Sequence, residues 1–382
     1  MDSGIRIGRI LGIPIHLHPS WFLVFLLVVL QLWRQLVAEY PAVEPAWRIG
    51  IAIVTSGLLF GSILMHELGH SVVALRHRVA VRSITLFIFG GLAFMEREPD
   101  NPRAELEIAL AGPAVNFCLF AVFGGLAGLF GPGEPGMAVF QWLAALNLAV
   151  ALFNLLPGFP LDGGRVLRAI LWARGRQPAQ ATRYAARIGQ LIAYTLVALG
   201  VIVVFTDVVS GIWLALIGGF ILTASVAHRR QATFEISLRG LVARDVMTDR
   251  VPMVDASLSV ARFAREQLLR GDRWAMVLAG GEPRGLISRT DVKRLAPELW
   301  ESTRVVEIAT PIAEVVMATP DLPVAEVMRL LTERPANQIP IVEGARMLGV
   351  VTLQNLLHAI ETRCPEPLRP DATAPAPEGR VL

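Results

Sequence analysis

The sequence is poor in charge and in cysteine. Charged residues make up 18% of its 382 residues, whereas an ordinary soluble domain carries about a quarter. Hydrophobic residues reach 54% and the mean hydropathy is +0.54, so the deficit of charge indicates a membrane protein. The two cysteines, Cys118 and Cys364, lie far apart and one falls in an apolar run, so the sequence implies no disulfide framework.

A dense basic cluster with interleaved aromatic residues is also missing, although the net charge is +3 and the pI is about 9.3. A basic pI is shared by proteins that bind nucleic acid and by membrane proteins with basic loops. Because no such cluster is present, we predict that nucleic acid is not a partner.

Six apolar segments are long enough to cross a bilayer, whose core of about 30 Å needs about 20 apolar residues in a helix. The fifth and sixth are separated only by Thr206 and Asp207, so five spans remain the alternative. We interpret the first segment, which begins near Trp21, as a retained helix rather than a cleaved signal peptide. The segments lie near residues 20–37, 49–75, 106–130, 137–157, 186–206 and 208–227.

Arginine alternates with loop number along this part of the chain. It is frequent in the second and fourth loops and follows the sixth segment, but it is absent from the third and fifth loops. Positively charged loops stay in the cytoplasm. The alternation therefore predicts a multi-pass protein of the inner (plasma) membrane with both termini in the cytoplasm.

The last third of the chain contains an internal repeat with an offset of 64 residues. The run AMVLAGGEPRGLISRTDV (275–292) aligns with IPIVEGARMLGVVTLQNL (339–356), and each copy suggests alternating strands and helices. We therefore predict a membrane domain over 1–230 and a soluble α/β domain over 241–362. The remaining assignments are a linker over 231–240, repeats at about 241–300 and 304–362, and a disordered Pro- and Ala-rich tail over 363–382.

The second apolar segment contains the run His66-Glu67-Leu68-Gly69-His70. Positions i and i+4 share one face of a helix, so both imidazoles can bind one zinc ion while Glu67 reaches a zinc-bound water. Two histidines and a glutamate within an apolar helix are costly and indicate function. The alternative is a polar trio that satisfies itself between helices.

A catalytic zinc needs a third protein ligand and one open position. The best candidate is Asp162, which follows the fourth apolar segment in the run NLLPGFPLDGGR. If the second and fourth helices run in the same direction, Asp162 and His70 lie near the same membrane surface. The prolines and glycines of this run break the helix, which is tolerated where the backbone lines a cavity. The alternative is an aspartate that serves only a turn or a helix cap.

Asn116 lies about 15 Å along the third helix, near the expected depth of His66. Its amide is suited to hold the substrate backbone or a developing oxyanion, and a helix–helix hydrogen bond is the equal alternative. His16 and His18 alternate as on a strand without ligand-like spacing. We interpret them as a polar edge at the membrane interface.

The combination of HELGH in a membrane helix with AGPAVN and NLLPGFPLDGGR resembles the site-2 proteases over most of residues 1–230. The resemblance implies that His66, His70 and Asp162 bind Zn²⁺ and that Glu67 is the catalytic acid and base. It also implies that Asn116 helps to position substrate. The apolar segment Ile84–Met95 resembles the family's membrane-embedded β-hairpin, whose edge can pair with an extended substrate. There is no room for the PDZ domain that many relatives carry.

The 64-residue repeat resembles a pair of CBS domains, which commonly bind adenosyl ligands through a Gly-x-x-Ser/Thr-x-x-Asp pattern. Ser288 and Asp291 match this pattern in the first repeat, whereas Thr352 and Asn355 occupy it in the second. An asparagine holds a ribose less well than an aspartate, which puts the second site in doubt. A module that only forms a homodimer or positions the substrate is the alternative to adenine nucleotide binding.

These features predict a polytopic α-helical membrane domain of about six transmembrane helices with a membrane-embedded β-hairpin, followed by a soluble α/β CBS pair. The expected function is zinc-dependent hydrolysis of peptide bonds in or near the transmembrane segments of membrane-anchored proteins. The resemblance implies a single-span substrate such as an anti-sigma factor, within the lipid bilayer. The rival hypothesis is a membrane transporter or channel regulated by CBS domains.

Overall fold

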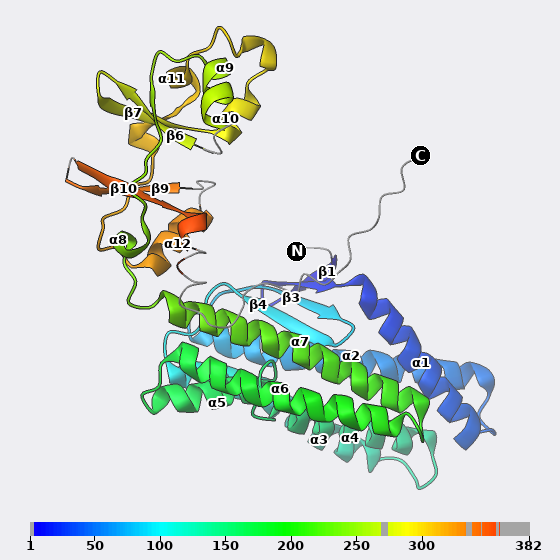
Figure 1. Ribbon diagram of the computed structural model, residues 1–382. Coiled ribbons are helices and arrows are strands. Elements are labelled where there is room, and N and C mark those ends of the chain that lie inside the picture. The colour runs from blue at the N-terminus through cyan, green and yellow to red at the C-terminus, as the bar shows by residue number, and fades with distance from the viewer. Residues whose placement is uncertain (1–3, 269–273, 334–337, 345, 357–358, 360–382) are drawn as a thin grey trace. The chain divides into compact units, whose positions relative to one another are not determined.

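The structure, a computed structural model, describes residues 4–268, 274–333, 338–344, 346–356 and 359 (Figure 1). The tail predicted over 363–382 lies outside the described residues. The chain divides into two compact units, Met1–Thr233 and Phe234–Leu382. Each unit is considered by itself below.

Among the described residues, six helices are long and apolar enough to cross a membrane, which confirms the predicted number. Five of them begin with proline at the first or second position. Proline lacks an N–H and has a fixed φ, and both properties suit the first turn of a helix. These helices therefore begin one to eight residues before the predicted apolar segments. The six helices are α1 (Pro19–Glu39), α2 (Pro45–Arg76), α3 (Pro102–Ala127), α4 (Pro135–Asn154), α6 (Pro178–Val203) and α7 (Val208–Leu238), of which α7 alone lacks the initial proline.

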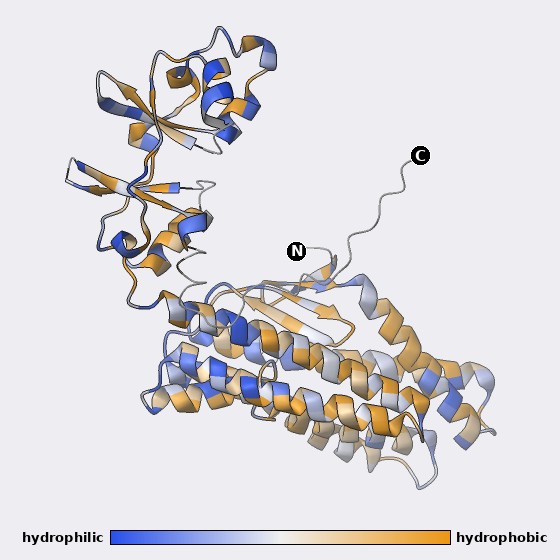
Figure 2. Cartoon of the chain, viewed as in Figure 1, coloured by the Kyte–Doolittle hydropathy of each residue, from blue (hydrophilic) through white to orange (hydrophobic). Residues whose placement is uncertain are grey.

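The outer surface of these helices is apolar rather than polar. Along α1, Phe22, Leu23 and Leu26 are each about half exposed, and hydrophobic residues predominate over the length of this helix (Figure 2). In water, so large an exposed apolar surface is unfavourable, whereas lipid solvates it. This pattern is typical of a multi-pass membrane protein.

A short helix, α5 (Asp162–Ala173), lies between α4 and α6 in the chain and packs against α3 and α6. The chain between α4 and α5 makes irregular turns, in which the backbone N–H of Phe159 donates to the carbonyl of Ala185 over 3.3 Å. Helix α5 thus brings the segment that follows α4 back against the membrane helices.

The membrane unit also contains a four-stranded sheet in the order β1-β2-β3-β4. Its strands are β1 (Ile5–Ile10), β2 (Ile13–Leu17), β3 (Val81–Phe87) and β4 (Gly90–Met95). The predicted hairpin is present as the antiparallel pair β3–β4, although it starts at Val81 rather than Ile84. Strand β2 pairs in parallel with β3, with Ile15 opposite Ile84. The buried side chains of Ile13, Leu17, Ile84 and Leu86 form the core beneath this sheet.

The second unit confirms the 64-residue repeat strand by strand. Strand β6 (Trp274–Ala279) corresponds to β9 (Gln338–Glu343), and β7 (Glu282–Ser288) corresponds to β10 (Arg346–Thr352), each at an offset of 64. The parallel contact of Val254 with Val277 recurs between Ala318 and Ile341, again 64 residues on. The sequence-related halves therefore have the same local fold.

Each half has its own apolar core, one around Phe263 and Ile287 and the other around Ile339 and Leu356. Helix α7 continues to Leu238, so most of the segment assigned to a linker, 231–240, is helical. The remaining elements are α8 (Ala243–Val246), β5 (Met253–Asp255), α9 (Val260–Phe263), a π-helical turn (Ala264–Leu268), α10 (Arg289–Arg294), 3-10 turns at Pro297–Leu299 and Ile312–Glu314, α11 (Val305–Ile308), β8 (Thr310–Pro311) and α12 (Val324–Glu333).

Candidate metal centre

Helix α2 presents three chemically active side chains on its buried face. His66 and His70, four residues apart, are 6% and 4% exposed, and Glu67 between them is 9% exposed. The i, i+4 spacing brings the two rings into edge-to-face contact, with centroids 4.7 Å apart. The sequence therefore predicted correctly that both imidazoles lie on one face.

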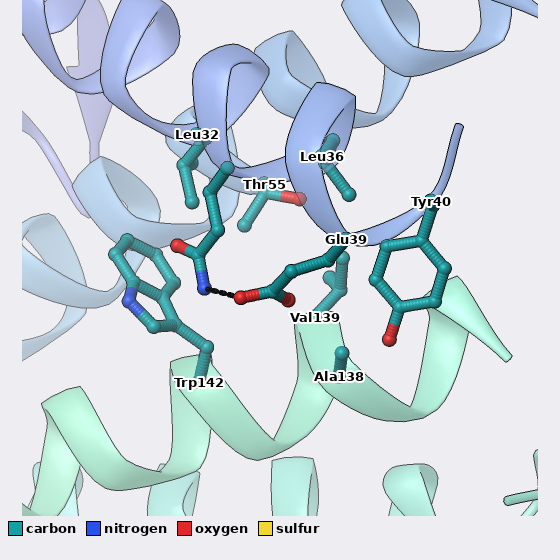
Figure 3. A pocket seen from close by; sticks show the side chains of 9 residues that line it. Leu32, Leu36, Glu39, Tyr40, Thr55, Ala138, Val139 and Trp142 are labelled. Carbon is teal, nitrogen blue, oxygen red and sulfur yellow. Dashed lines mark hydrogen bonds between the residues drawn. The ribbon is translucent and has the colours of Figure 1, made fainter. Parts of the chain in front are cut away.

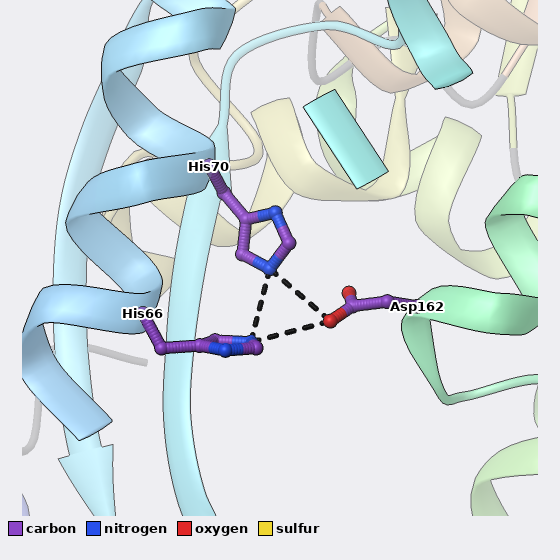
Figure 4. A group of neighbouring side chains, drawn as sticks. All are labelled: His66, His70 and Asp162. Carbon is purple, nitrogen blue, oxygen red and sulfur yellow. Dashed lines mark hydrogen bonds and ion pairs between the residues drawn. The ribbon is translucent and has the colours of Figure 1, made fainter. Parts of the chain in front are cut away.

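Asp162, the first residue of α5, faces these two rings (Figure 4). Its Oδ2 lies 3.2 Å from Nε2 of His66 and 3.3 Å from Nε2 of His70. The two Nε2 atoms lie 3.1 Å from each other. The three ligand atoms thus form a compact triangle, and we refer to these residues as the His–Asp trio.

The trio fits a divalent metal ion by the chemistry of its donors. Nδ1 of His70 lies 2.6 Å from the backbone carbonyl of Ile108, and Nδ1 of His66 lies 2.5 Å from Oδ1 of Asn116. Both partners accept, so each Nδ1 carries the proton and each Nε2 offers a lone pair. Oδ2 of Asp162 is buried without a hydrogen-bond donor among the described residues. Three converging acceptor atoms repel one another unless a cation lies among them, and two imidazoles with one carboxylate suit Zn²⁺.

Helix α3 comes unusually close to the trio at Gly112. A Cβ at this position would lie 2.2 Å from Nε2 of His70 and 2.6 Å from Nε2 of His66. Any side chain here would therefore occupy the space towards which the two ring nitrogens point. The close approach of the glycine backbone keeps that space free.

A cavity of about 740 Å³ opens in front of the trio. Glu67 lines it beside His66 and His70, and most of the remaining lining is apolar. Residues 88–93 of the β3–β4 hairpin also line the cavity, together with residues of α1, α4 and α7. Gly91 of β4 lies so close to Glu67 that a Cβ there would be 2.4 Å from Cγ of Glu67. The catalytic candidate and the hairpin edge thus share one cavity.

A buried ion-pair cluster holds α5 against its neighbours. Arg168 donates through Nε to Glu105 of α3 and through Nη1 to Glu98 over 3.1 Å. Glu105 is 0% exposed and Arg168 is 7% exposed. Burial disfavours the charged guanidinium, but Glu105 and Glu98 more than offset this and raise the pKa of Arg168 above its ordinary value. Because Asp162 begins the same helix, the cluster also fixes the position of that carboxylate.

Three asparagines surround the trio in different ways. Asn116 is 1% exposed, contacts His66 and donates through Nδ2 to Oδ1 of Asn147 over 2.8 Å. It is not among the residues that line the cavity, whereas Asn154 is. Neither Asn147 nor Asn154 was predicted to be functional from the sequence. Gln141, Asn147 and Asn154 interrupt the apolar sequence of α4, and a polar residue within such a helix was the available signal for Asn147.

The candidate nucleotide residues of the second unit are engaged in local hydrogen bonds. The N–H and hydroxyl of Ser288 donate to Oδ2 of Asp291 over 2.9 and 2.7 Å, at the start of α10. In the second repeat, the N–H of Asn355 donates to Oγ1 of Thr352 over 3.2 Å. Both pairs therefore act as helix caps in this structure.

His16 and His18 do not join the trio. His16 lies in β2 opposite Thr85 of β3. His18 caps α1, where its Nδ1 accepts from the N–H of Ser20 over 3.2 Å. His18 is thus part of the local structure at the start of the first membrane helix.

A second, much smaller hollow of about 30 Å³ lies between α1 and α4 (Figure 3). Its one carboxylate, that of Glu39, accepts a hydrogen bond from Gln35 over 3.1 Å. The remaining lining includes Leu32, Tyr40 and Trp142. A hollow of this size holds little more than a water molecule, so the chemistry belongs to the larger cavity.

Comparison with known proteins identifies both units. A family model for Peptidase family M50 matches residues 54–133 and 134–197, and the CBS domain model matches residues 243–298 and 305–362. Rip3 of Mycobacterium tuberculosis, whose name carries a provisional assignment as a zinc metalloprotease, is 35% identical over 94% of this chain and 94% of its own length. The zinc metalloprotease MJ0392 of Methanocaldococcus jannaschii is 28% identical over 94% of this chain and 97% of its own length.

Among solved structures, a site-2 protease from Methanocaldococcus jannaschii is 34% identical and is matched over 59% of this chain and 95% of its own, with a TM-score of 0.43. The identity to Rip3 extends over nearly the whole of both chains, so the relationship includes the membrane unit and the repeats together. The chain therefore belongs to Peptidase family M50, the site-2 protease family, and carries a pair of CBS domains.

Proposed function

We propose that this protein is an intramembrane zinc metalloprotease that hydrolyses peptide bonds within or near the transmembrane segments of membrane-anchored proteins. The observation that supports it most is the His–Asp trio beside Glu67 in a mainly apolar cavity. The trio supplies three ligands and leaves room for a fourth, as a catalytic zinc site requires. A transporter or channel would also explain the helices and the cavity, but it would not need three such ligands with the carboxylate of Glu67 beside them.

In this mechanism a bound zinc ion supplies Lewis acidity, which polarises the scissile carbonyl and acidifies a water molecule. Glu67 accepts a proton from the attacking water and then delivers it to the amine of the leaving chain, so its carboxylate returns to its starting protonation state. A substrate helix must unwind before its peptide bond becomes accessible. The edge of β4, which borders the cavity at residues 90–93, offers backbone groups that can pair with the extended segment.

The substrate class is a single-span membrane protein, such as an anti-sigma factor, and the product would be a released cytoplasmic fragment. We place the catalytic domain at residues 1–230 and a regulatory module at 241–362. The alternation of arginine among the loops supports an inner-membrane protein with both termini in the cytoplasm. Single cysteines at Gly133 and Arg174 should then be labelled by impermeant reagents from opposite sides of the membrane. Labelling of both from the same side would contradict this orientation.

For the CBS pair we propose that an adenine nucleotide binds at the first repeat and regulates cleavage. The support is the match of Ser288 and Asp291 to the ligand pattern of that family. Because these residues now bond to each other, a ribose would have to share or displace the carboxylate. Calorimetry with ATP, ADP and AMP should show binding that Asp291→Ala abolishes. Homodimerisation without any heat of binding would favour the alternative role of the module.

The decisive experiment compares the purified wild-type protein with Glu67→Gln on a transmembrane test substrate, with zinc measured in both. We expect about one zinc in each, and a loss of cleavage of about 100-fold or more in the variant. Zinc at background level in the wild type would refute the metalloprotease and favour the transporter. Equal cleavage by both proteins would remove Glu67 from the mechanism.

A further inference from the structure

A chain of buried hydrogen bonds leads from α4 to one of the histidines of the trio. Asn147, which is 1% exposed, donates through Nδ2 to the carbonyl of Leu143 over 2.9 Å and to Oγ of Ser62 over 3.3 Å. Its Oδ1 accepts from Nδ2 of Asn116 over 2.8 Å. Oδ1 of Asn116 in turn lies 2.5 Å from Nδ1 of His66. Three helices, α2, α3 and α4, thus meet in a single polar path.

The direction of this path is fixed at its start. A backbone carbonyl can only accept, so the amide of Asn147 must turn its NH₂ group towards Leu143. The hydroxyl of Ser62 already donates to the carbonyl of Leu58 over 2.9 Å. It therefore presents a lone pair to the same NH₂ group. Two acceptors in different helices thus hold Asn147 in one of its two possible orientations.

The orientation then passes from one amide to the next. Because Oδ1 of Asn147 faces α3, Asn116 must present its NH₂ group to it. The opposite side of that amide, Oδ1, then faces His66 and accepts the proton on Nδ1. The lone pair of His66 is left on Nε2, the atom that points at Asp162. The carbonyl of Leu143 in α4, which can only accept, therefore selects the tautomer of His66 in α2 through Asn147 and Asn116.

We infer that Asn147 is a positioning residue for the metal centre: by orienting Asn116, it holds His66 in the tautomer whose Nε2 can bind a metal ion. The inference rests on the proposed function, because it treats His66 as a zinc ligand. It also assigns Asn116, which is absent from the cavity lining, to the support of His66 rather than to contact with substrate. His70 needs no such chain of hydrogen bonds, since the carbonyl of Ile108 accepts directly from Nδ1 of His70.

The variant Asn147→Leu removes the hydrogen bond between Asn147 and Asn116 while keeping a side chain of similar size. Asn116 then has no partner in α4 to distinguish its two ends, and its NH₂ group can turn towards His66. That orientation favours a proton on Nε2, which must be lost before a metal binds. Changes to groups that orient metal ligands cost about 10–100-fold in affinity, and we expect at least about 10-fold weaker zinc binding. Competition with a chromophoric chelator on the full-length protein in detergent measures it.

A second change distinguishes this role from a general effect on folding. A carboxylate accepts whichever way it is turned, so Asn116→Asp in the Asn147→Leu background should restore zinc affinity to within about 3-fold of the wild type. In the presence of Asn147 the same Asn116→Asp change should weaken zinc binding, because two acceptor oxygens would then face each other. The sign of the Asn116→Asp effect therefore reverses between the two backgrounds, as a double-mutant cycle records.

Ser56→Ala serves as the matched control. Ser56 is a buried serine of the same helix as His66, but its hydroxyl donates only within α2, to the carbonyl of Ala52 over 2.8 Å. It should leave zinc affinity unchanged. Wild-type zinc affinity in Asn147→Leu, or no rescue by Asn116→Asp in a protein that still elutes as one species, would overturn the inference. Absence of zinc from the wild type would instead refute the proposed function itself.

Discussion

Replacing Gly112 with alanine adds a single methyl group at the centre of the His–Asp trio. Its ideal position is 2.2 Å from Nε2 of His70 and 2.6 Å from Nε2 of His66, whereas ordinary contact begins at 3.4 Å. The two ring nitrogens must therefore retreat by about 1.2 Å and 0.8 Å, the differences between these distances. Zinc–nitrogen distances of about 2.0–2.1 Å tolerate deviations of only about 0.2 Å. We expect the variant to lose zinc.

The same change should leave the protein folded. Alanine gains about 1 kcal/mol over glycine in a helix, and overpacking in a tight interior costs about 1–3 kcal/mol. The net loss of stability is therefore at most about 2 kcal/mol, too little to unfold the membrane unit. Thermal unfolding in detergent and zinc content by mass spectrometry separate the two effects.

Gly125→Ala provides the control for Gly112→Ala in the same helix. A Cβ at Gly125 meets nothing within 4 Å, so this variant should keep its zinc and be equally or slightly more stable. A Gly112→Ala protein that holds one zinc with wild-type affinity would refute the reasoning. It would mean that the ring nitrogens do not converge on the space beside Gly112.

Three further predictions concern Glu67, the carboxylate that we propose to be catalytic, the support of α5 and the removal of zinc. Gly91→Ala should displace Glu67, since the added Cβ would lie 2.4 Å from Cγ of Glu67. Cleavage should fall while zinc content stays constant. Unchanged cleavage would contradict the close contact between Gly91 and Glu67. Arg168→Met should cost about 3–5 kcal/mol, because it leaves the buried Glu105 without its ion pair. Unfolding midpoints measure this loss, and Glu105→Gln in the same chain should recover most of it. Removal of zinc by 1,10-phenanthroline should lower the free energy of unfolding of the wild type by about 4 kcal/mol if zinc was present at 1,000 times its Kd. Gly112→Ala should show no such decrease.

The sequence predicted the parts of the fold that depend on local pattern. Long apolar runs located the six helices, and the prolines explain why most of them start earlier than hydropathy alone suggests. The spacing of His66 and His70 determined that they share a face of α2. The repeat located the strands of the CBS pair, because each copy provides independent information on the same elements.

Contacts between distant segments were harder to predict. Strand β1 was not predicted, and for β2 the sequence showed only the strand-like alternation of His16 and His18. The pairing of β2 with β3 could not be predicted, since Ile15 and Ile84 are 69 residues apart in the sequence. Asn147 was missed for a related reason: a polar residue in an apolar helix indicates a partner but not which helix supplies it. Of the two readings of Asn116, the helix–helix hydrogen bond is present as its bond to Asn147, whereas its contact with His66 was not predicted.

The length of α2 bears on how water reaches the reaction. At 1.5 Å per residue its 32 residues extend about 48 Å, well beyond a bilayer core of about 30 Å. Counted from Pro45, His66 is residue 22 of this helix, so about 20 residues suffice to cross the core before the trio is reached. His66 lies 10 residues, or about 15 Å, from the end of α2 at Arg76, and 21 residues from its start at Pro45. The shorter path for the water of the proposed reaction therefore leads from the Arg76 end of the helix.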